Sequence, residues 1–242
     1  MQPEDKIVIL TGAGISAESG LATFRDDGGL WAQHRIEDVA TPEAFARDPV
    51  LVHRFYSMRR TQAAAAEPNP AHVALARLQR DWPGEVVIVT QNVDGLHERA
   101  GATALHMHGE LSRALCAACG HRWDAPSEMT PETTCPACAQ VSARPDIVWF
   151  GEMPYHMDEI EAHLADCAVF AAIGTSGQVW PAAGFVREAA RAGAETVEMN
   201  LERSEVSRAF DTVRIGPAGR VVPAWVDGIL TAGTGGTTGG AP

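Results

Sequence analysis

Short, uninterrupted apolar runs recur along the chain, with longer mixed segments between them. Residues 6–10 (KIVIL), 86–90 (VVIVT) and 169–173 (VFAAI) are rich in β-branched residues, which is typical of strands buried on both faces of a parallel sheet. Shorter strands are expected over residues 104–108, 196–200 and 213–215. Because helical segments separate these runs, the pattern predicts an α/β fold with a Rossmann-like, doubly wound parallel sheet.

Helix starts are marked by a capping residue followed by proline. Thr41-Pro42, Asp48-Pro49 and Asn69-Pro70 all carry this signal, so residues 42–81 should form several helices. Other helices are expected after the glycine turn at residues 11–16, over residues 181–191 with Gly193 closing them, and over residues 224–230. From residue 231 onward the chain is rich in Gly and Thr with no apolar anchor, which predicts disorder.

These elements predict a large domain interrupted by a small one. The Rossmann-like domain should comprise residues 1–26, 86–111 and 146–230. The inserted domain should have a helical part at 27–85 and a zinc-binding module at 112–145, and residues 231–242 should form a disordered tail.

Composition narrows the class of protein. The chain has 242 residues, 45% of them hydrophobic and 21% charged, with a net charge of −12. This balance argues against a nucleic-acid partner, because such binders present a basic face. No apolar stretch reaches the roughly 18 residues needed to cross a bilayer, and the N-terminus does not resemble a signal peptide. We therefore expect a cytoplasmic protein with no membrane partner.

Four cysteines have the spacing of a metal site. Cys116, Cys119, Cys135 and Cys138 form C-x2-C-x15-C-x2-C, which predicts one Zn²⁺ held by four thiolates. A filled tetrahedral shell leaves no position for water, so the metal should be structural. The alternative is four buried thiols without metal. Cys167 lies in an apolar run and is expected to be a core residue.

Polar and glycine residues follow the predicted strands. Gly12-Ala13-Gly14 fits a turn that brings backbone N–H groups close to a pyrophosphate, although such turns also serve as tight turns alone. Residues 91–94 (QNVD) could hold a carboxamide and a ribose, or could equally cap the next helix. The acidic ribose ligand of a dehydrogenase has no clear counterpart, so an unmodified Rossmann dehydrogenase fits poorly.

Histidine and arginine supply further candidates. His108 at the end of a strand is a candidate general base, but His106 and His97 are close and the chain has nine histidines. Tyr56 and Arg59 are three residues apart on a predicted helix, so they share a face and could bind a carboxylate. From the residues alone, a solvated Arg beside a partly buried Tyr is the favoured interpretation.

Together these motifs resemble the sirtuin family over residues 6–230, nearly the whole chain. The similarity rests on residues 12–16 (GAGIS), 24–25 (FR), 91–94 (QNVD), 108–109 (HG), 148–152 (VWFGE) and 174–176 (GTS), on Asn200 and on the four cysteines. It implies an NAD-dependent protein-lysine deacylase in which His108 is the catalytic base and zinc is structural. The cofactor residues that it implies are Gly12, Ala13, Gly14, Ile15, Ser16, Phe24, Arg25, Gln91, Asn92, Val93, Asp94, Gly174, Thr175, Ser176, Asn200, Leu201, Glu202 and Ala218.

The resemblance also implies how substrate is held. Val148, Trp149, Phe150 and Gly151 match the segment that pairs with the backbone of an acyl-lysine protein or peptide. Tyr56-x-x-Arg59 matches the signature of class III members, in which the pair meets the carboxylate of a succinyl, malonyl or glutaryl group. This implication reverses the interpretation favoured by the residues alone.

The implied activity is desuccinylation and demalonylation with weaker deacetylation, releasing nicotinamide and 2'-O-acyl-ADP-ribose. The alternatives are a protein mainly active as a deacetylase, an ADP-ribosyltransferase, an idle NAD-responsive binding module, and a zinc-ribbon nucleic-acid binder. The few basic residues of the zinc segment argue against the last, and His108 argues against the binding module. Gly177 and Trp180 depart from the family pattern and bear on cofactor affinity.

Overall fold

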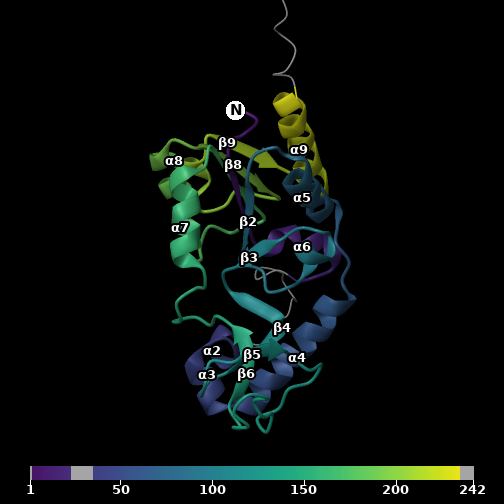
Figure 1. The fold of residues 1–242 in the computed structure, drawn as a ribbon, viewed down its shortest axis with the longest axis vertical. Coiled ribbons are helices and arrows are strands. Elements are labelled where there is room, and N and C mark those ends of the chain that lie inside the picture. Colours follow the sequence, from purple (N-terminus) through teal and green to yellow (C-terminus); the bar gives the residue numbers. More distant parts are fainter. Residues whose placement is uncertain (1, 23–34, 235–242) are drawn as a thin grey trace, which may run out of the picture.

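A six-stranded parallel sheet forms the centre of the larger part of the protein (Figure 1). The computed structural model describes residues 2–22 and 35–234. The strand order is β3-β2-β1-β7-β8-β9, which is the doubly wound order with its switch point between β1 and β7. This confirms the predicted fold class. The strands are β1 (Ile7–Thr11), β2 (Val86–Thr90), β3 (Ala104–His106), β7 (Val169–Ile173), β8 (Glu195–Asn200) and β9 (Thr212–Ile215).

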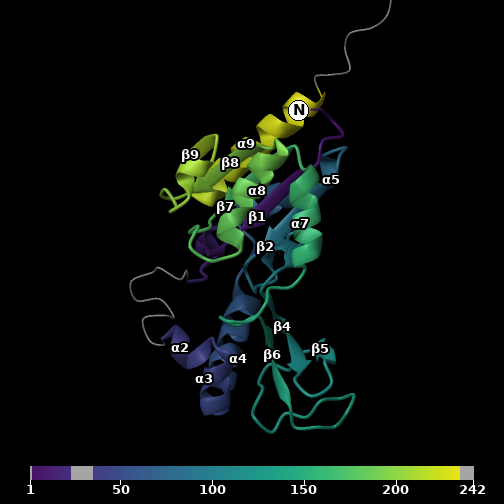
Figure 2. The ribbon, with the colours of Figure 1, turned by 90° about the vertical axis from the view of Figure 1, so that its left-hand side faces the viewer.

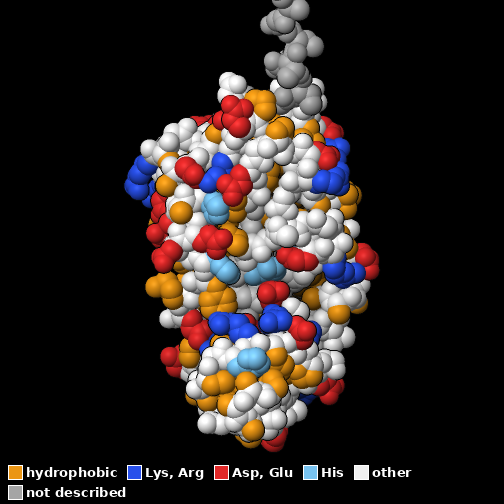
Figure 3. Space-filling model, in the orientation of Figure 1, with side chains coloured by type: hydrophobic (Ala, Val, Ile, Leu, Met, Phe, Trp, Pro, Cys, Tyr) orange, Lys and Arg blue, Asp and Glu red, His pale blue; other side chains and the backbone are white. Residues whose placement is uncertain are grey.

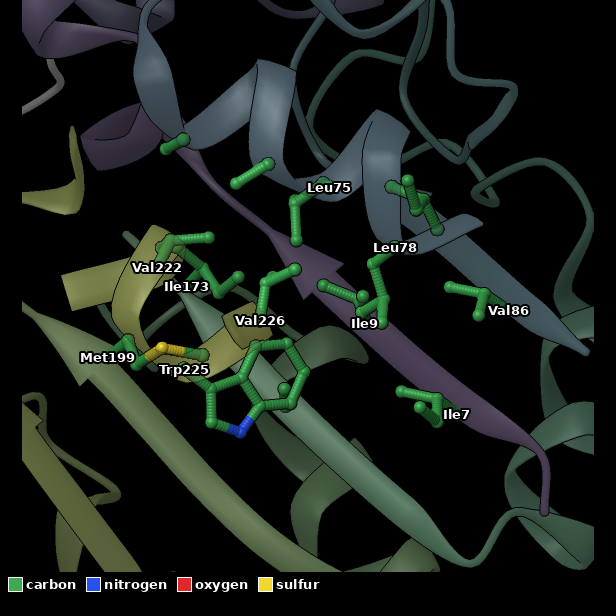
Figure 4. Packing of buried hydrophobic residues seen from close by; sticks show 14 of the residues in the cluster. Ile7, Ile9, Leu75, Leu78, Val86, Ile173, Met199, Val222, Trp225 and Val226 are labelled. Atoms are coloured by element: carbon green, nitrogen blue, oxygen red, sulfur yellow. The ribbon is translucent and has the colours of Figure 1, made fainter. Parts of the chain in front are cut away.

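Helices cover both faces of this sheet. Ile7 and Ile9 pack with α5 (Pro70–Asp81) and α9 (Ala218–Thr234), whereas Val8 and Leu10 face the layer of α7 (Met157–Asp166) and α8 (Phe185–Ala192). This alternation is the two-residue period of a strand buried on both sides. Figure 4 shows the first layer, where Leu75, Leu78, Val222, Trp225 and Val226 meet the strands.

A smaller unit projects from the strand-end side of the sheet (Figure 2). It combines a three-stranded antiparallel sheet with helices, and a shared core joins α4 to the strands through Val52, Phe55, Leu111 and Ile147. Its elements are α2 (Ile36–Val39), α3 (Pro42–Arg47), α4 (Pro49–Ala65), β4 (Gly109–Cys116), β5 (Arg122–Asp124) and β6 (Ala143–Ile147). The short α6 (Leu96–Arg99) lies between β2 and β3.

The three predicted helix caps are confirmed. The side chain of Thr41 accepts from Ala44 N, and Asp48 accepts from Leu51 N at the start of α4. Asn69 accepts from Ala71 N, and proline occupies the first turn in each case.

Three segments differ from the sequence-based expectation. The predicted small-domain segment 27–85 extends too far, because α5 packs on the large sheet. The last helix spans Ala218–Thr234 rather than 224–230, because Val222, Trp225 and Val226 bury its first turns despite Pro223. Residues 231–234 are therefore helical rather than part of a disordered tail, and residues 235–242 lie outside the described chain.

The expected helix after the glycine turn is also absent from residues 13–22. Two 3-10 turns, Ala13–Ile15 and Ala17–Ser19, stand in its place, and Gly20 ends the second with a φ of 83°. Near residue 181 a 3-10 turn (Ala182–Gly184) precedes α8, which Gly193 closes as expected. None of the helices in the described parts of the chain is both long enough and apolar enough to cross a bilayer.

Candidate active site

Two loops meet backbone to backbone at the switch point of the sheet. The loop after β1 contains Gly12, Ala13, Gly14 and Ile15, and Gly14 N donates to Gly174 O, 2.8 Å away, in the loop after β7. A Cβ on Gly14 would lie 2.7 Å from the Gly174 Cα, so this approach requires glycine. The glycines thus have a packing role, and they also place the turn where ligands bind in this fold.

The loop after β2 brings polar side chains to the same place. Asn92 donates to Gly12 O at 3.2 Å and to Ser16 Oγ at 3.1 Å, and Ser16 donates to Asp94 Oδ2 at 3.0 Å. All three side chains are buried. Asp94 also accepts from Leu96 N at the start of α6, so its helix-capping role is present too. Because both amide hydrogens of Asn92 are engaged, its side-chain oxygen is the group it can offer to a ligand.

His108 lies in the two-residue turn between β3 and β4, beside this loop. Its Nδ1 is 3.1 Å from the carbonyl oxygen of Gln91, so Nδ1 carries the hydrogen and Nε2 has the lone pair. Burial lowers the pKa of His108 below the ordinary 6.5, against the opposing effect of that hydrogen bond. A half-buried imidazole, neutral at pH 7 and with Nε2 available, is suited to accept a proton.

The neighbouring histidines are placed differently. His97 is buried, contacts Thr11 Oγ1 at 3.0 Å, and has its pKa lowered to about 3, mainly by burial. His106 bridges Asn92 O at 3.1 Å and Glu98 Oε1 at 3.2 Å, so both ring nitrogens are engaged. Nδ1 of His97 also has no partner among the described residues, but it is fully buried. Of these three, His108 is therefore the one with an uncommitted nitrogen on a partly exposed ring.

Other predicted cofactor residues extend along the strand ends. Gln91 Nε2 donates to Thr175 Oγ1 at 3.1 Å, and Asn200 Nδ2 donates to Thr175 O at 2.6 Å, which ties together the loops after β2, β7 and β8. Val93 O accepts from Leu111 N at 2.8 Å, which fixes the loop to the smaller unit. Ser176 lies in the loop after β7, Leu201 and Glu202 follow β8, and Ala218 begins α9 after β9, whereas Phe24 and Arg25 fall outside the described residues.

The segment after β6 runs alongside His108. Val148 N donates to His108 O at 2.9 Å, Phe150 N donates to Ala40 O at 3.0 Å, and Trp149 N donates to Glu152 Oε2 at 2.8 Å. These three N–H groups are thus satisfied within the protein. A substrate strand at this segment would pair with carbonyl groups or with Gly151.

Tyr56 and Arg59 share a face of α4, as predicted. Tyr56 is buried with an exposed fraction of 2%, and burial raises its pKa to about 12. Its oxygen accepts from Trp149 Nε1 at 3.0 Å, and among the described residues nothing accepts the hydroxyl hydrogen. Arg59 is half-buried, and burial lowers the pKa of its guanidinium, with Tyr56 and Asp94 acting in the opposite direction. Within residues 2–22 and 35–234, Arg59 has neither a hydrogen bond nor an ion pair.

The four cysteines converge at the end of the smaller unit. Their sulfur atoms lie within 4.8 Å of one another, with Sγ distances of 3.7 Å for Cys116–Cys138 and 3.8 Å for Cys119–Cys135. Tetrahedral Zn–S bonds of about 2.3 Å require sulfurs about 3.8 Å apart, so the donor set fits one Zn²⁺.

Both C-x-x-C turns have the same backbone pattern. Cys116 N donates to His121 O and Cys116 O accepts from Gly120 N, while Cys135 has the matching bonds to Gln140 and Ala139. Gly120 and Ala139 both have positive φ, 74° and 58°. Two matching turns that point four thiols at one position are typical of a structural zinc site.

Sequence reasoning missed the contacts that hold Trp149, in the segment after β6, in place. Arg144 binds Glu152 through two bonds of 2.6 and 2.9 Å and lies 3.6 Å from the centroid of the Trp149 ring. In the sequence, the sign of these contacts was Arg144 itself, one of the few basic residues of the zinc segment.

On the face seen in Figure 3, the described acidic, basic and histidine side chains are intermixed rather than gathered into a basic surface.

Comparison with known proteins gives a consistent result. A profile described as "Sir2 family" matches residues 12–181. An NAD-dependent protein deacylase of Bdellovibrio bacteriovorus is 54% identical over 228 residues, covering 93% of this chain and 96% of that protein. A Sir2 homologue solved with NAD has a TM-score of 0.87 at 37% identity, covering 95% of this chain and 91% of its own. A Sir2 homologue mutant bound to 2'-O-acetyl ADP ribose has a TM-score of 0.87 at 36% identity, covering 96% and 95% of the two chains.

Proposed function

Because this chain belongs to the Sir2 family, we propose that it removes acyl groups from protein lysine side chains with NAD as cosubstrate, and that it prefers succinyl and malonyl groups to acetyl. The observation that carries the proposal is the position of His108. Its Nδ1 is bound to the loop after β2, and that loop is joined by hydrogen bonds to the loops after β1 and β7, where a dinucleotide would bind in this fold.

The residues of the strand-end loops suit this cosubstrate. The buried Asn92, Asp94 and Ser16 side chains could hold its carboxamide end, and the Gly12–Gly14 turn could approach its pyrophosphate. Thr175 and Asn200 lie further along the sheet, where the adenosine end would extend. NAD would supply the ribose carbon attacked by the acyl oxygen, the nicotinamide leaving group and the ribose hydroxyl that takes up the acyl group.

His108 then has a defined task. Its Nε2 accepts the proton of the ribose hydroxyl while Nδ1–H remains bound to Gln91 O, which keeps the ring in place and stabilises the imidazolium. The lowered pKa of His108 keeps the base neutral before the reaction.

Two uncommitted donors support the acyl preference. Arg59 offers a guanidinium with no carboxylate partner among the described residues, and Tyr56 offers a hydroxyl hydrogen without an acceptor there. An acyl carboxylate between them would accept hydrogen bonds from both groups. The carboxylate in turn would need the fixed cation of Arg59, because a negative charge that leaves water is costly without one. An acetyl group would leave both unsatisfied.

Product analysis tests this proposal. Succinyl-lysine and acetyl-lysine peptides are incubated with NAD, and the nucleotide products are identified by mass spectrometry. The proposal predicts free lysine peptide, nicotinamide and 2'-O-acyl-ADP-ribose in equal amounts. Transfer of ADP-ribose to the peptide would favour the ADP-ribosyltransferase alternative, and hydrolysis without NAD would contradict the proposal.

A further inference from the structure

The Tyr56 hydroxyl is held by the indole of Trp149. Both side chains are buried, with exposed fractions of 2% and 3%, and Trp149 Nε1–H donates to the phenolic oxygen at 3.0 Å. An indole nitrogen can only donate, so the direction of this bond is fixed. The hydroxyl hydrogen must therefore point away from Trp149, and the described residues offer it no acceptor.

Trp149 is fixed from two directions. The guanidinium carbon of Arg144 lies 3.6 Å from the centroid of the Trp149 ring, and Arg144 is bound to both carboxylate oxygens of Glu152. The same carboxylate accepts from Trp149 N at 2.8 Å. Phe45 adds a ring contact at 5.2 Å. The planar guanidinium and the carboxylate thus hold the backbone and the ring of Trp149 together.

We propose that Trp149, held by Arg144 and Glu152, is a positioning residue for acyl selectivity. The indole N–H donates to a lone pair of the Tyr56 oxygen, so the hydroxyl hydrogen points away from Trp149 and is available to an acyl carboxylate. An unoriented hydroxyl would lose part of this bond by rotating. The inference rests on the proposed preference for acidic acyl groups, since an acetyl group has no carboxylate to receive that hydrogen.

The sharpest test removes only the indole N–H. Replacing Trp149 with 3-benzothienylalanine keeps a bicyclic ring of similar shape and puts sulfur in place of the N–H. We measure kcat/KM for succinyl-lysine and acetyl-lysine peptides of identical sequence at saturating NAD. The succinyl-to-acetyl ratio should fall about three- to tenfold, which corresponds to the loss of one neutral hydrogen bond.

A double-mutant cycle separates positioning from packing. In a Tyr56→Phe background, the same replacement should change the ratio by less than about twofold, because no hydroxyl remains to be oriented. Arg144→Lys keeps the charge opposite Glu152 but loses the planar group over the indole, so it should lower the ratio by a smaller factor. Trp149→Phe provides a second N–H-free variant, and the thermal midpoint of each variant checks its fold.

The outcomes distinguish this inference from the proposed function. The inference is overturned if removal of the Trp149 N–H lowers kcat/KM for the succinyl and acetyl peptides by the same factor. It is also overturned if the succinyl-to-acetyl ratio falls equally with and without the Tyr56 hydroxyl. If the wild-type enzyme prefers the succinyl peptide and the variant without the Trp149 N–H has the same succinyl-to-acetyl ratio, only the positioning role fails. If the wild-type enzyme has no preference for succinyl and Tyr56→Phe changes nothing, the proposed acyl preference fails as well.

Discussion

The imidazole of His108 and the peptide carbonyl of Gln91 lie 3.1 Å apart, which fixes the tautomer of the proposed base. The side chain of the same Gln91 donates to Thr175 Oγ1, in the loop after β7. One residue after β2 therefore connects His108 to the loop after β7. This connection makes the position of the base depend on the sheet rather than on the smaller unit alone.

Replacing His108 with alanine should lower kcat/KM by about two to four orders of magnitude, because the ribose hydroxyl would lose its proton acceptor. Zinc content and thermal midpoint should stay as in the wild type. His163→Ala, on α7 and outside the strand-end loops, serves as the control and should retain activity. Retained turnover in His108→Ala would place the base elsewhere.

The pH dependence of kcat/KM should show the titration of His108. Burial lowers the pKa of this imidazole from 6.5, and the reactive form is the neutral one. Activity should therefore fall as the pH decreases and be constant above neutrality, with an apparent pKa below 6.5 for the acidic limb. An acidic limb centred above pH 7 in the free enzyme would contradict this assignment.

Arg59→Met should reduce desuccinylation much more than deacetylation. Breaking a buried charge pair costs about 2 kcal/mol or more, equivalent to roughly a thirtyfold loss of kcat/KM for succinyl-lysine. Arg54→Met changes an exposed arginine on the same helix and should leave the substrate ratio as it is. Equal losses on both substrates in Arg59→Met would remove Arg59 from the acyl pocket.

Cys135→Ser should release the metal and destabilise the smaller unit, because the four thiolates fit one Zn²⁺. We expect zinc stoichiometry to fall from one towards zero and the thermal midpoint to fall by roughly 10 °C. Cys167→Ser changes the cysteine that lies outside the cluster and should keep its zinc. An unchanged midpoint in Cys135→Ser would contradict a structural role for the metal.

Local patterns in the sequence predicted most of the fold. β-Branched runs gave the three central strands, and capping residues before proline gave the starts of α3, α4 and α5. Assigning α5 to a layer required its partners, because an amphipathic helix does not specify which sheet it covers. The start of α9 was missed because Pro223 resembles a first-turn proline, whereas tertiary packing keeps it inside the helix.

The site could be predicted only in part. The zinc ligands follow from spacing, but chemistry alone did not choose among the histidines. The structure distinguishes His97, His106 and His108 by the partners of their ring nitrogens, which are hydroxyl, carbonyl and carboxylate groups up to 86 positions away. The contact of Tyr56 with Trp149 joins residues 93 positions apart, so no local pattern could reveal it.

The most direct measurement compares kcat/KM for succinyl-lysine and acetyl-lysine peptides of identical sequence, each with and without saturating NAD. Our account predicts turnover only with NAD and a higher value for the succinyl peptide. Turnover without NAD, or a value for the acetyl peptide equal to or above that for the succinyl peptide, would contradict it.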